Sequence, residues 1–104
     1  MEKECPSIRI MNILSKKWML IILRELSDHG YLRFGYIIKR VNGISSRTLS
    51  KRLKELEDLK IVKREQFNET PPRVEYSLTS SGKEIIRSFK SLDKWSLKNK
   101  ITHY

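Results

Sequence analysis

The spacing of the apolar residues changes twice along this 104-residue chain, and those changes limit the folds that it can adopt. Up to Leu59, apolar side chains recur every three or four residues, which is the period of an amphipathic α-helix. Val74, Tyr76 and Leu78 then alternate with polar residues, as in a half-buried strand. After Thr79 the helical spacing returns. The sequence therefore predicts a mainly α (α+β) fold, in which a small antiparallel sheet is set among helices.

The first part of the chain predicts four helices, over residues 7–16, 17–28, 34–41 and 46–59. In the second of them, Leu20 and Ile21 widen the apolar stripe, so we expect that helix to be buried on more than one side. Asn42-Gly43 is a turn signal between the third and the fourth helix. Either Ser45 or Ser46 can cap the fourth helix by accepting a hydrogen bond from a free backbone N–H.

The fourth predicted helix has two different faces at helical spacing. One face carries leucines, at Leu49, Leu53 and Leu56. The other carries cations, at Arg47, Lys51 and Lys54. Two helices joined by a tight turn, of which the second is basic, form a helix-turn-helix. The major groove of a DNA duplex accepts one α-helix, whose free N-terminal N–H groups favour phosphate.

A hairpin is expected to follow, with strands at 61–66 and 73–79. The connection at 68–72 ends in two prolines, which cannot donate to a strand ladder. This hairpin makes the motif a winged helix-turn-helix. We expect one domain over 1–104, arranged as an N-terminal helix (7–16), a winged core (17–79) with a recognition helix (46–59) and a wing (61–79), and a C-terminal helix (80–98).

Charge supports a polyanionic partner. The chain has 22 Lys and Arg against 12 Asp and Glu, a formal net charge of +10. Residues 31–64 hold ten of these cations and three of the carboxylates, so the excess is concentrated around the predicted motif. No apolar run approaches the roughly 18 residues of a membrane span, and no export signal opens the chain. We therefore expect double-stranded DNA as the partner, no membrane contact, and a cytoplasmic protein.

The predicted DNA-binding residues come from the basic helix, its flanks and the wing: Arg33, Ser45, Ser46, Arg47, Ser50, Lys51, Lys54, Lys63, Arg64 and Arg73. Arg47 is the candidate for reading guanine, because a guanidinium can bond O6 and N7 together. The wing can lie along the backbone or enter a minor groove. The alternatives are a solvated face for each helix residue and, for Arg73, pairing with Glu65 or Glu75 across the strands.

Several motifs resemble the HxlR-type winged helix-turn-helix regulators, which are MarR-like. They are the run 71–79 with Gly82, the stretch 43–49 with Leu53, Glu55 and Leu56, Cys5-Pro6, and Lys17-Trp18 with 22–26. The resemblance implies a dimeric bacterial or archaeal transcription regulator. Two positions depart from the family pattern: Lys16 stands where Gly is usual, and Gly35-Tyr36-Ile37 replaces a polar residue followed by Glu-Leu.

Family members pair through their N- and C-terminal helices. The corresponding apolar residues here, the predicted dimerisation residues, are Ile8, Met11, Ile85, Phe89, Leu92 and Trp95. A chain of this size cannot easily absorb both helices in one core, although both could instead cover that core. A dimer spaces its recognition helices by one duplex turn, about 34 Å, which predicts an inverted-repeat DNA site.

Cys5 matches the position at which some family members sense oxidants. It is the only cysteine, so a disulfide must join two subunits or a small thiol. The alternative is an unreactive residue near a flexible end. His29 and His103 stand far apart with no second cysteine, so neither a metal site nor a cofactor is expected, and no constellation typical of an enzyme stands out.

Together these patterns predict a sequence-specific transcription regulator that acts as a homodimer and represses by occluding a promoter. Two alternatives remain at this point. One is an architectural DNA-binding protein with little sequence preference. The other is a winged helix used for protein contacts in transcription. The effector, the operator and the regulated genes are not encoded in these patterns.

Overall fold

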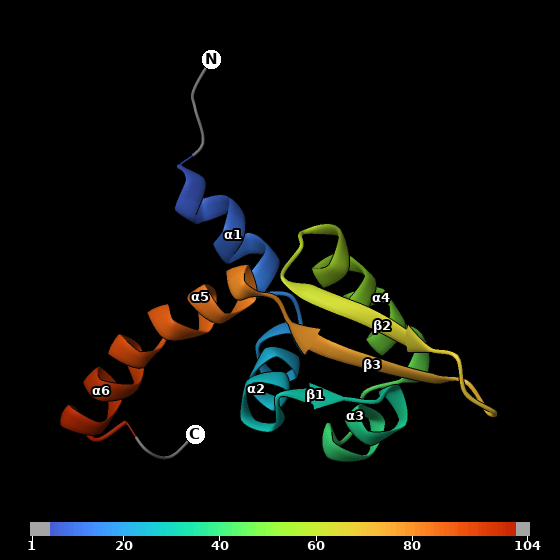
Figure 1. Cartoon of the computed structure of the whole chain (residues 1–104). Coiled ribbons are helices and arrows are strands. Elements are labelled where there is room, and N and C mark those ends of the chain that lie inside the picture. Colours follow the sequence, from blue (N-terminus) through green and yellow to red (C-terminus); the bar gives the residue numbers. More distant parts are fainter. Residues whose placement is uncertain (1–4, 102–104) are drawn as a thin grey trace.

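The computed structural model describes residues 5–101 of the chain. Most of the chain is helical, and a small sheet projects from the group of helices (Figure 1). In chain order the elements are α1 (Pro6–Leu14), α2 (Met19–His29), β1 (Tyr31–Leu32), α3 (Phe34–Arg40), α4 (Ser46–Asp58), β2 (Val62–Phe67), β3 (Arg73–Leu78), α5 (Ser80–Ser88) and α6 (Lys90–Lys98). The predicted winged helix-turn-helix is confirmed, with α3 and α4 as its helix pair and β2–β3 as its wing.

The sheet is antiparallel, with β3 in the centre and the strand order β1-β3-β2. The hairpin register pairs Val62 with Leu78 at its base and Phe67 with Arg73 at its tip. Strand β1 was not predicted, because two residues are too few to display a period. It pairs Tyr31 with Ser77 and so connects the end of α2 to the sheet.

The core lies between α2, α3, α4 and the base of the wing. The predicted leucine face of α4 is confirmed, since Leu49, Leu53 and Leu56 are at most 1% exposed. From α2 the core receives four side chains, Met19, Ile22, Leu23 and Leu26. Burial of α2 on more than one side is wrong, because Leu20 and Ile21 are nearly half exposed.

Two helix boundaries differ from the prediction for local reasons. The second helix begins at Met19 rather than at residue 17, because Trp18 adopts a left-handed backbone conformation with φ 76°. The expected C-terminal helix 80–98 is divided at Phe89 into α5 and α6, where the Phe89 N–H donates to the Ile86 carbonyl three residues back (3.0 Å) rather than to the carbonyl four residues back.

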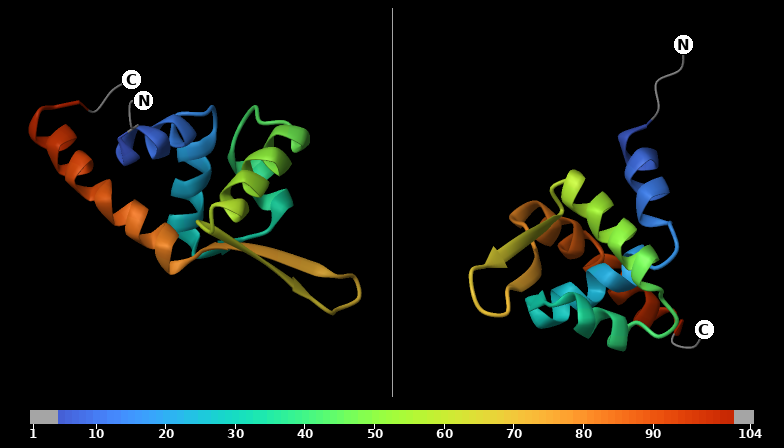
Figure 2. Two further views of the ribbon diagram at one scale, coloured as in Figure 1. Left: turned by 90° about the horizontal axis from the view of Figure 1, so that it is seen from above. Right: turned by 90° about the vertical axis from the view of Figure 1, so that its right-hand side faces the viewer.

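Thr79 and Gly82 fix the start of α5 against the base of the wing. The Thr79 hydroxyl accepts a hydrogen bond from the Gly82 N–H (3.0 Å) and donates to the Lys60 carbonyl (2.6 Å). A Cβ at Gly82 would overlap the carbonyl oxygen of Ile61, so only glycine allows this close approach. From this junction the wing and the α5–α6 arm extend in opposite directions (Figure 2).

Candidate nucleic-acid interface

The N-terminus of α4 is built by the turn that precedes it. Gly43 has φ +98°, a conformation that glycine adopts without steric cost. The Ser45 hydroxyl accepts a hydrogen bond from the Thr48 N–H at 3.1 Å, so Ser45 rather than Ser46 is the cap. The positive end of the helix dipole and the remaining free N–H groups are therefore held at a defined point on the surface.

The cationic face of α4 is exposed and in part unpaired. Arg47 and Lys51 are exposed, and no carboxylate within residues 5–101 forms an ion pair with either of them. Lys54 lies 3.3 Å from Asp58, but both side chains are more than 60% exposed, and such a surface pair contributes little. This face is available to bind an anion.

The other predicted polar residues of this region lie around that face. Ser46 and Ser50 are exposed on α4. The Ser45 hydroxyl is engaged in the cap and also donates to the Thr48 Oγ1 at 2.9 Å. Arg33 is exposed at the N-terminus of α3, the first helix of the helix-turn-helix.

The predicted wing cations have different surroundings. Arg64 is exposed and has no carboxylate partner within the described residues. Lys63 lies 3.8 Å from Glu65, with both side chains more than half exposed.

Arg73 is more constrained than the other two. It forms ion pairs with Glu69 (3.1 Å) and Glu75 (3.3 Å) and stacks over Phe67, with 4.3 Å from Cζ to the ring centroid. Arg73 thus does pair with Glu75, but the expected direction across the strands is wrong, because both residues lie on β3 and the residue opposite Arg73 is Phe67. Arg73 shapes the tip of the wing from within.

The structure also reveals charged contacts that the sequence analysis missed. Glu55 on α4 accepts hydrogen bonds from Lys16 (2.7 Å) and Arg52 (2.7 Å). These contacts, the Lys16 bond foremost, lower the pKa of the Glu55 carboxyl. Glu25 on α2 accepts a bond from Arg40 at 3.1 Å, which joins α2 to the end of α3 and raises the pKa of that guanidinium.

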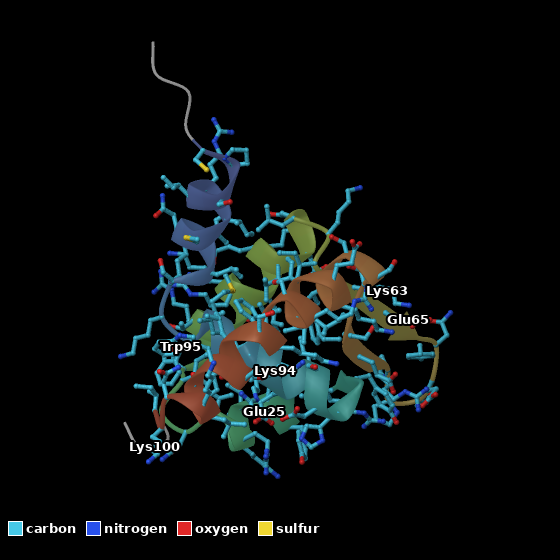
Figure 3. All side chains as sticks on the ribbon, turned by 90° about the vertical axis from the view of Figure 1, so that its left-hand side faces the viewer. Glu25, Lys63, Glu65, Lys94, Trp95 and Lys100 are labelled. Carbon is cyan, nitrogen blue, oxygen red and sulfur yellow. The ribbon has the colours of Figure 1, made fainter. Side chains whose placement is uncertain are left out.

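The predicted dimerisation residues form two groups. Ile8, Met11, Leu92 and Trp95 are exposed by 48–61% of their surface, whereas Ile85 and Phe89 pack against the core. In Figure 3, Trp95 lies on α6, away from the wing residues Lys63 and Glu65. Helix α6 has no buried residue at all. Its apolar side chains Leu92, Trp95 and Leu97 therefore keep more than half of their surface exposed.

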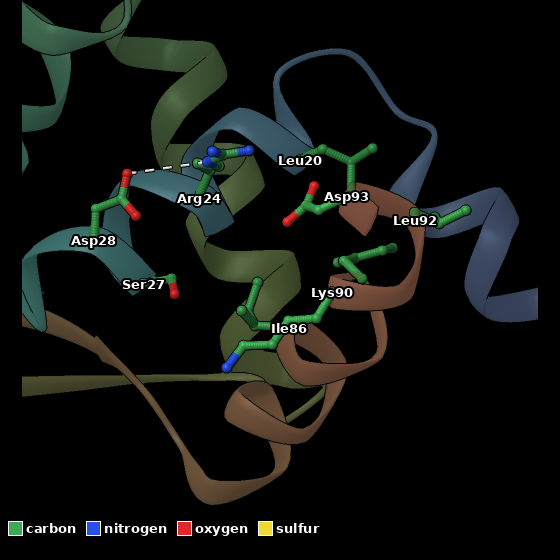
Figure 4. A pocket seen from close by; sticks show the side chains of 9 residues that line it. Leu20, Arg24, Ser27, Asp28, Ile86, Lys90, Leu92 and Asp93 are labelled. Atoms are coloured by element: carbon green, nitrogen blue, oxygen red, sulfur yellow. Dashed lines mark ion pairs between the residues drawn. The ribbon is translucent and has the colours of Figure 1, made fainter. Parts of the chain in front are cut away.

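A groove of about 400 Å³ adjoins this apolar surface. It lies between α2, which contributes Leu20 and Arg24, and the α5–α6 arm, which contributes Ile86, Leu92 and Asp93 (Figure 4). The exposed Leu20 is thus continuous with the exposed face of α6. Large contiguous apolar patches on soluble proteins mark interaction sites.

Cys5 is exposed at the N-cap position of α1. Polar groups at the start of that helix, the Ser7 N–H first, lower the pKa of the Cys5 thiol by stabilising its thiolate. His103, which the sequence analysis excluded as a metal ligand, lies outside the described residues.

A comparison with known protein families gives the same type of fold as the helix-turn-helix and the wing described above. The model of the HxlR-like helix-turn-helix family matches residues 13–104. The chain belongs to this family. The resemblance to HxlR-type regulators, which the motifs at 43–49 and 71–79 indicated, is therefore confirmed over most of the chain.

Several proteins similar to this HxlR-like chain, by sequence or by solved structure, are regulators. An HTH-type transcriptional regulator of Synechocystis sp. is 43% identical over 81 residues; the match covers 78% of this chain and 59% of that protein's length. The reduced form of the regulator YodB from Bacillus subtilis is 36% identical, with a TM-score of 0.80 over 90% of this chain and 92% of that one. YodB has also been solved after diamide treatment.

The redox regulator HypR in its reduced form is 31% identical, with a TM-score of 0.81 over 92% of this chain and 94% of that one. The Synechocystis protein and YodB are transcriptional regulators and HypR is a redox regulator, in agreement with the prediction that this HxlR-like chain is a regulator and not an enzyme. No helix within residues 5–101 is long and apolar enough to cross a membrane.

Proposed function

We propose that this protein is a sequence-specific transcription regulator that inserts α4 into the major groove of duplex DNA. The observation that carries the proposal is the division of α4 into two faces. Its leucines are buried in the core, which fixes the helix to the domain, while Arg47 and Lys51 are exposed without ion-pair partners among the described residues. A capped N-terminus beside them adds positive potential towards phosphate.

Each cation has a proposed role. Arg47 reads guanine through O6 and N7, and Lys51 and Lys54 hold bases or phosphates. Ser46, Ser50 and Arg33 add hydrogen bonds around the groove. In the wing, Lys63 and Arg64 contact the DNA backbone. Arg73 has the same role once it exchanges Glu69 for a phosphate.

We propose that the regulator acts as a homodimer. The support is α6, which carries Leu92 and Trp95 more than half exposed and buries no residue in its own chain. A helix with an apolar stripe needs a surface to cover that stripe. The groove beside Leu20 extends the same apolar surface, and Met11 on α1 is a further exposed apolar side chain. A second copy of the chain covers it in a symmetric pair.

A dimer of this kind binds an inverted repeat and represses by occluding a promoter in the cytoplasm of a bacterium or archaeon. The decisive experiment is selection of bound sequences from a random duplex library. We expect enrichment of an inverted repeat with half-sites about 10 bp apart, because two symmetric recognition helices read one face of the duplex. Sedimentation of the free protein should give twice the 12.4 kDa mass of one chain.

The same selection separates the alternatives. Equal affinity for selected and random duplexes would identify an architectural DNA-binding protein. Absence of duplex binding would leave the winged helix as a site for protein contacts. Enrichment of a single, asymmetric half-site together with a monomeric mass would overturn the dimer.

Cys5 supports a second proposal, that oxidants control DNA binding. The thiol is exposed, its pKa is lowered, and the related structures include a redox regulator and a diamide-treated protein. Diamide oxidises two thiolates to one disulfide and is itself reduced to the hydrazine. Here the disulfide joins Cys5 of two subunits.

We expect diamide to weaken operator binding of the wild type and to leave the Cys5→Ser variant unchanged. Both proteins are compared first without oxidant, where they should bind alike, and then by gel shift and by non-reducing electrophoresis. If the two proteins respond equally to diamide, or if oxidation leaves wild-type affinity unchanged, oxidant sensing through Cys5 is rejected.

A further inference from the structure

The turn between α1 and α2 is attached to α4 by two hydrogen bonds, and a third bond within α4 connects the two α4 side chains that form them. Lys16 Nζ donates to Glu55 Oε2 at 2.7 Å, and Arg52 Nη1 donates to Glu55 Oε1 at 2.7 Å. Arg52 Nε donates to the backbone carbonyl of Lys17 at 3.0 Å. We call Lys16, the Lys17 carbonyl, Arg52 and Glu55 the Glu55 clamp. It spans 39 positions of sequence between its two ends.

Glu55 is the centre of the clamp because each of its carboxylate oxygens binds a different cation. Its side chain is 24% exposed, and that of Arg52 is 15% exposed, so both are shielded from water more than an ordinary surface pair. The lowered pKa of the carboxyl keeps it ionised at neutral pH. Charge-assisted bonds of this length are stronger than neutral ones.

The position of the clamp on α4 is specific. At 100° per residue, Arg52 and Glu55 lie on the side of the helix between its cationic and leucine faces. The leucines prevent α4 from leaving the core, but a row of similar side chains permits small rotations and tilts. Directed hydrogen bonds beside the cationic face limit those movements.

The same turn also packs against the helix-turn-helix turn. Trp18 has φ 76°, and its ring faces Gly43 so closely that a Cβ there would lie 3.4 Å from Trp18 Cη2. Residues 16–18 thus contact both the start of the α4 region and its middle. A segment attached at two separated points defines an orientation as well as a position.

We infer that Glu55 is a positioning residue. Through its bonds to Lys16 and Arg52, it holds α4 at the angle that base readout requires. The inference rests on the proposed function, since it concerns how α4 meets DNA. Base readout requires side-chain placement to within a fraction of an ångström, whereas attraction between a cationic face and phosphates tolerates small rotations. The clamp therefore supports affinity for the operator and not affinity for DNA of any sequence.

Whether DNA affinity rises or falls when the Glu55 carboxylate is removed distinguishes a positioning role from a purely electrostatic one. Removing a carboxylate makes the protein more positive, and electrostatics alone then predicts tighter binding to any duplex. Loss of positioning predicts weaker binding to the operator. The Glu55→Gln variant keeps the shape of the side chain and removes its charge, so the two effects are opposed in one measurement.

The experiment measures affinities for the selected operator and for a random duplex at one salt concentration. For Glu55→Gln we expect about a fivefold to tenfold weaker operator binding, on the scale of one imperfect base contact, with random-duplex binding unchanged or tighter. The matched control is Asp58→Asn. It removes one carboxylate from the same helix, where Asp58 pairs only with the exposed Lys54, and it should bind both duplexes as tightly as the wild type or more tightly.

A second pair of variants tests the other end of the clamp. Lys16→Met should reduce the preference for operator over random duplex. Lys16→Arg preserves the ion pair with Glu55 and should keep the wild-type preference. These variants decide the question if Glu55→Gln unfolds. If Glu55→Gln matches Asp58→Asn, or if Lys16→Met keeps the wild-type preference, the inference is overturned. A wild type without any operator preference would instead overturn the proposed function.

Discussion

The double variant Arg47→Ala with Lys51→Ala is expected to bind the operator at least about a hundredfold more weakly than the wild type. Loss of one base-reading or phosphate-binding cation costs about 1–3 kcal/mol, and a dimer loses each of them twice. Both side chains are exposed on α4, so the fold should persist. Gel-shift or fluorescence titration on the selected operator measures the change, and circular dichroism checks that the helices remain.

The control is Lys83→Ala with Arg87→Ala, which removes the same charge from α5 instead of α4; both side chains are exposed and neither lines the groove beside Leu20. It should change affinity far less, because the α5–α6 arm leads away from the wing. Equal losses from both double variants would show that net charge alone determines binding, and it would remove α4 from the interface.

Leu53→Ala is expected to destabilise the folded protein by about 2–5 kcal/mol. Leu53 is 1% exposed and lies in the leucine face of α4, so truncation leaves a cavity between this helix and the rest of the core. The free energy of unfolding, from urea denaturation at a fixed protein concentration, measures the loss. The concentration must be matched because dimerisation contributes to apparent stability.

Lys54→Ala is the control at the next position of the same helix. It removes an exposed side chain and should change the free energy of unfolding by less than about 0.5 kcal/mol. If Leu53→Ala were no more destabilising than Lys54→Ala, α4 would not be fixed to the domain through its leucines, and the two-faced helix that supports the proposed function would be lost.

The sequence predicted the parts of the fold that depend on local periodicity. The leucine face of α4, the two strands of the hairpin and the turn at Gly43 all follow from spacing that neighbours along the chain define. The alternating burial expected for the second strand is wrong, because residues 73–77 of β3 are all half-buried. Strand β1 could not be predicted, because a two-residue strand exists only through its pairing with β3. The left-handed backbone of Trp18, whose ring lies against Gly43, likewise has no signal in the local spacing.

For the candidate site, the sequence predicted the exposed cations but not their surroundings. Arg47 and Lys51 were visible as one helical stripe. The Arg52–Glu55 contact also has a local signal, since residues three apart on a helix are neighbours. Lys16 could not be connected to Glu55, because nothing in the sequence reports a contact between residues so far apart. The exposure of Leu20 was missed because apolar spacing does not distinguish a core from an unpaired surface.

The central place of β3 has a mechanical consequence. Because β3 pairs with β1 as well as with β2, the wing is continuous with the strand that leads into α3. The sheet therefore sets the separation between the wing and the helix pair. If both elements contact DNA as we propose, a duplex has to bring its adjacent grooves to that separation, and we expect base pairs outside the contacts to influence binding through their resistance to bending.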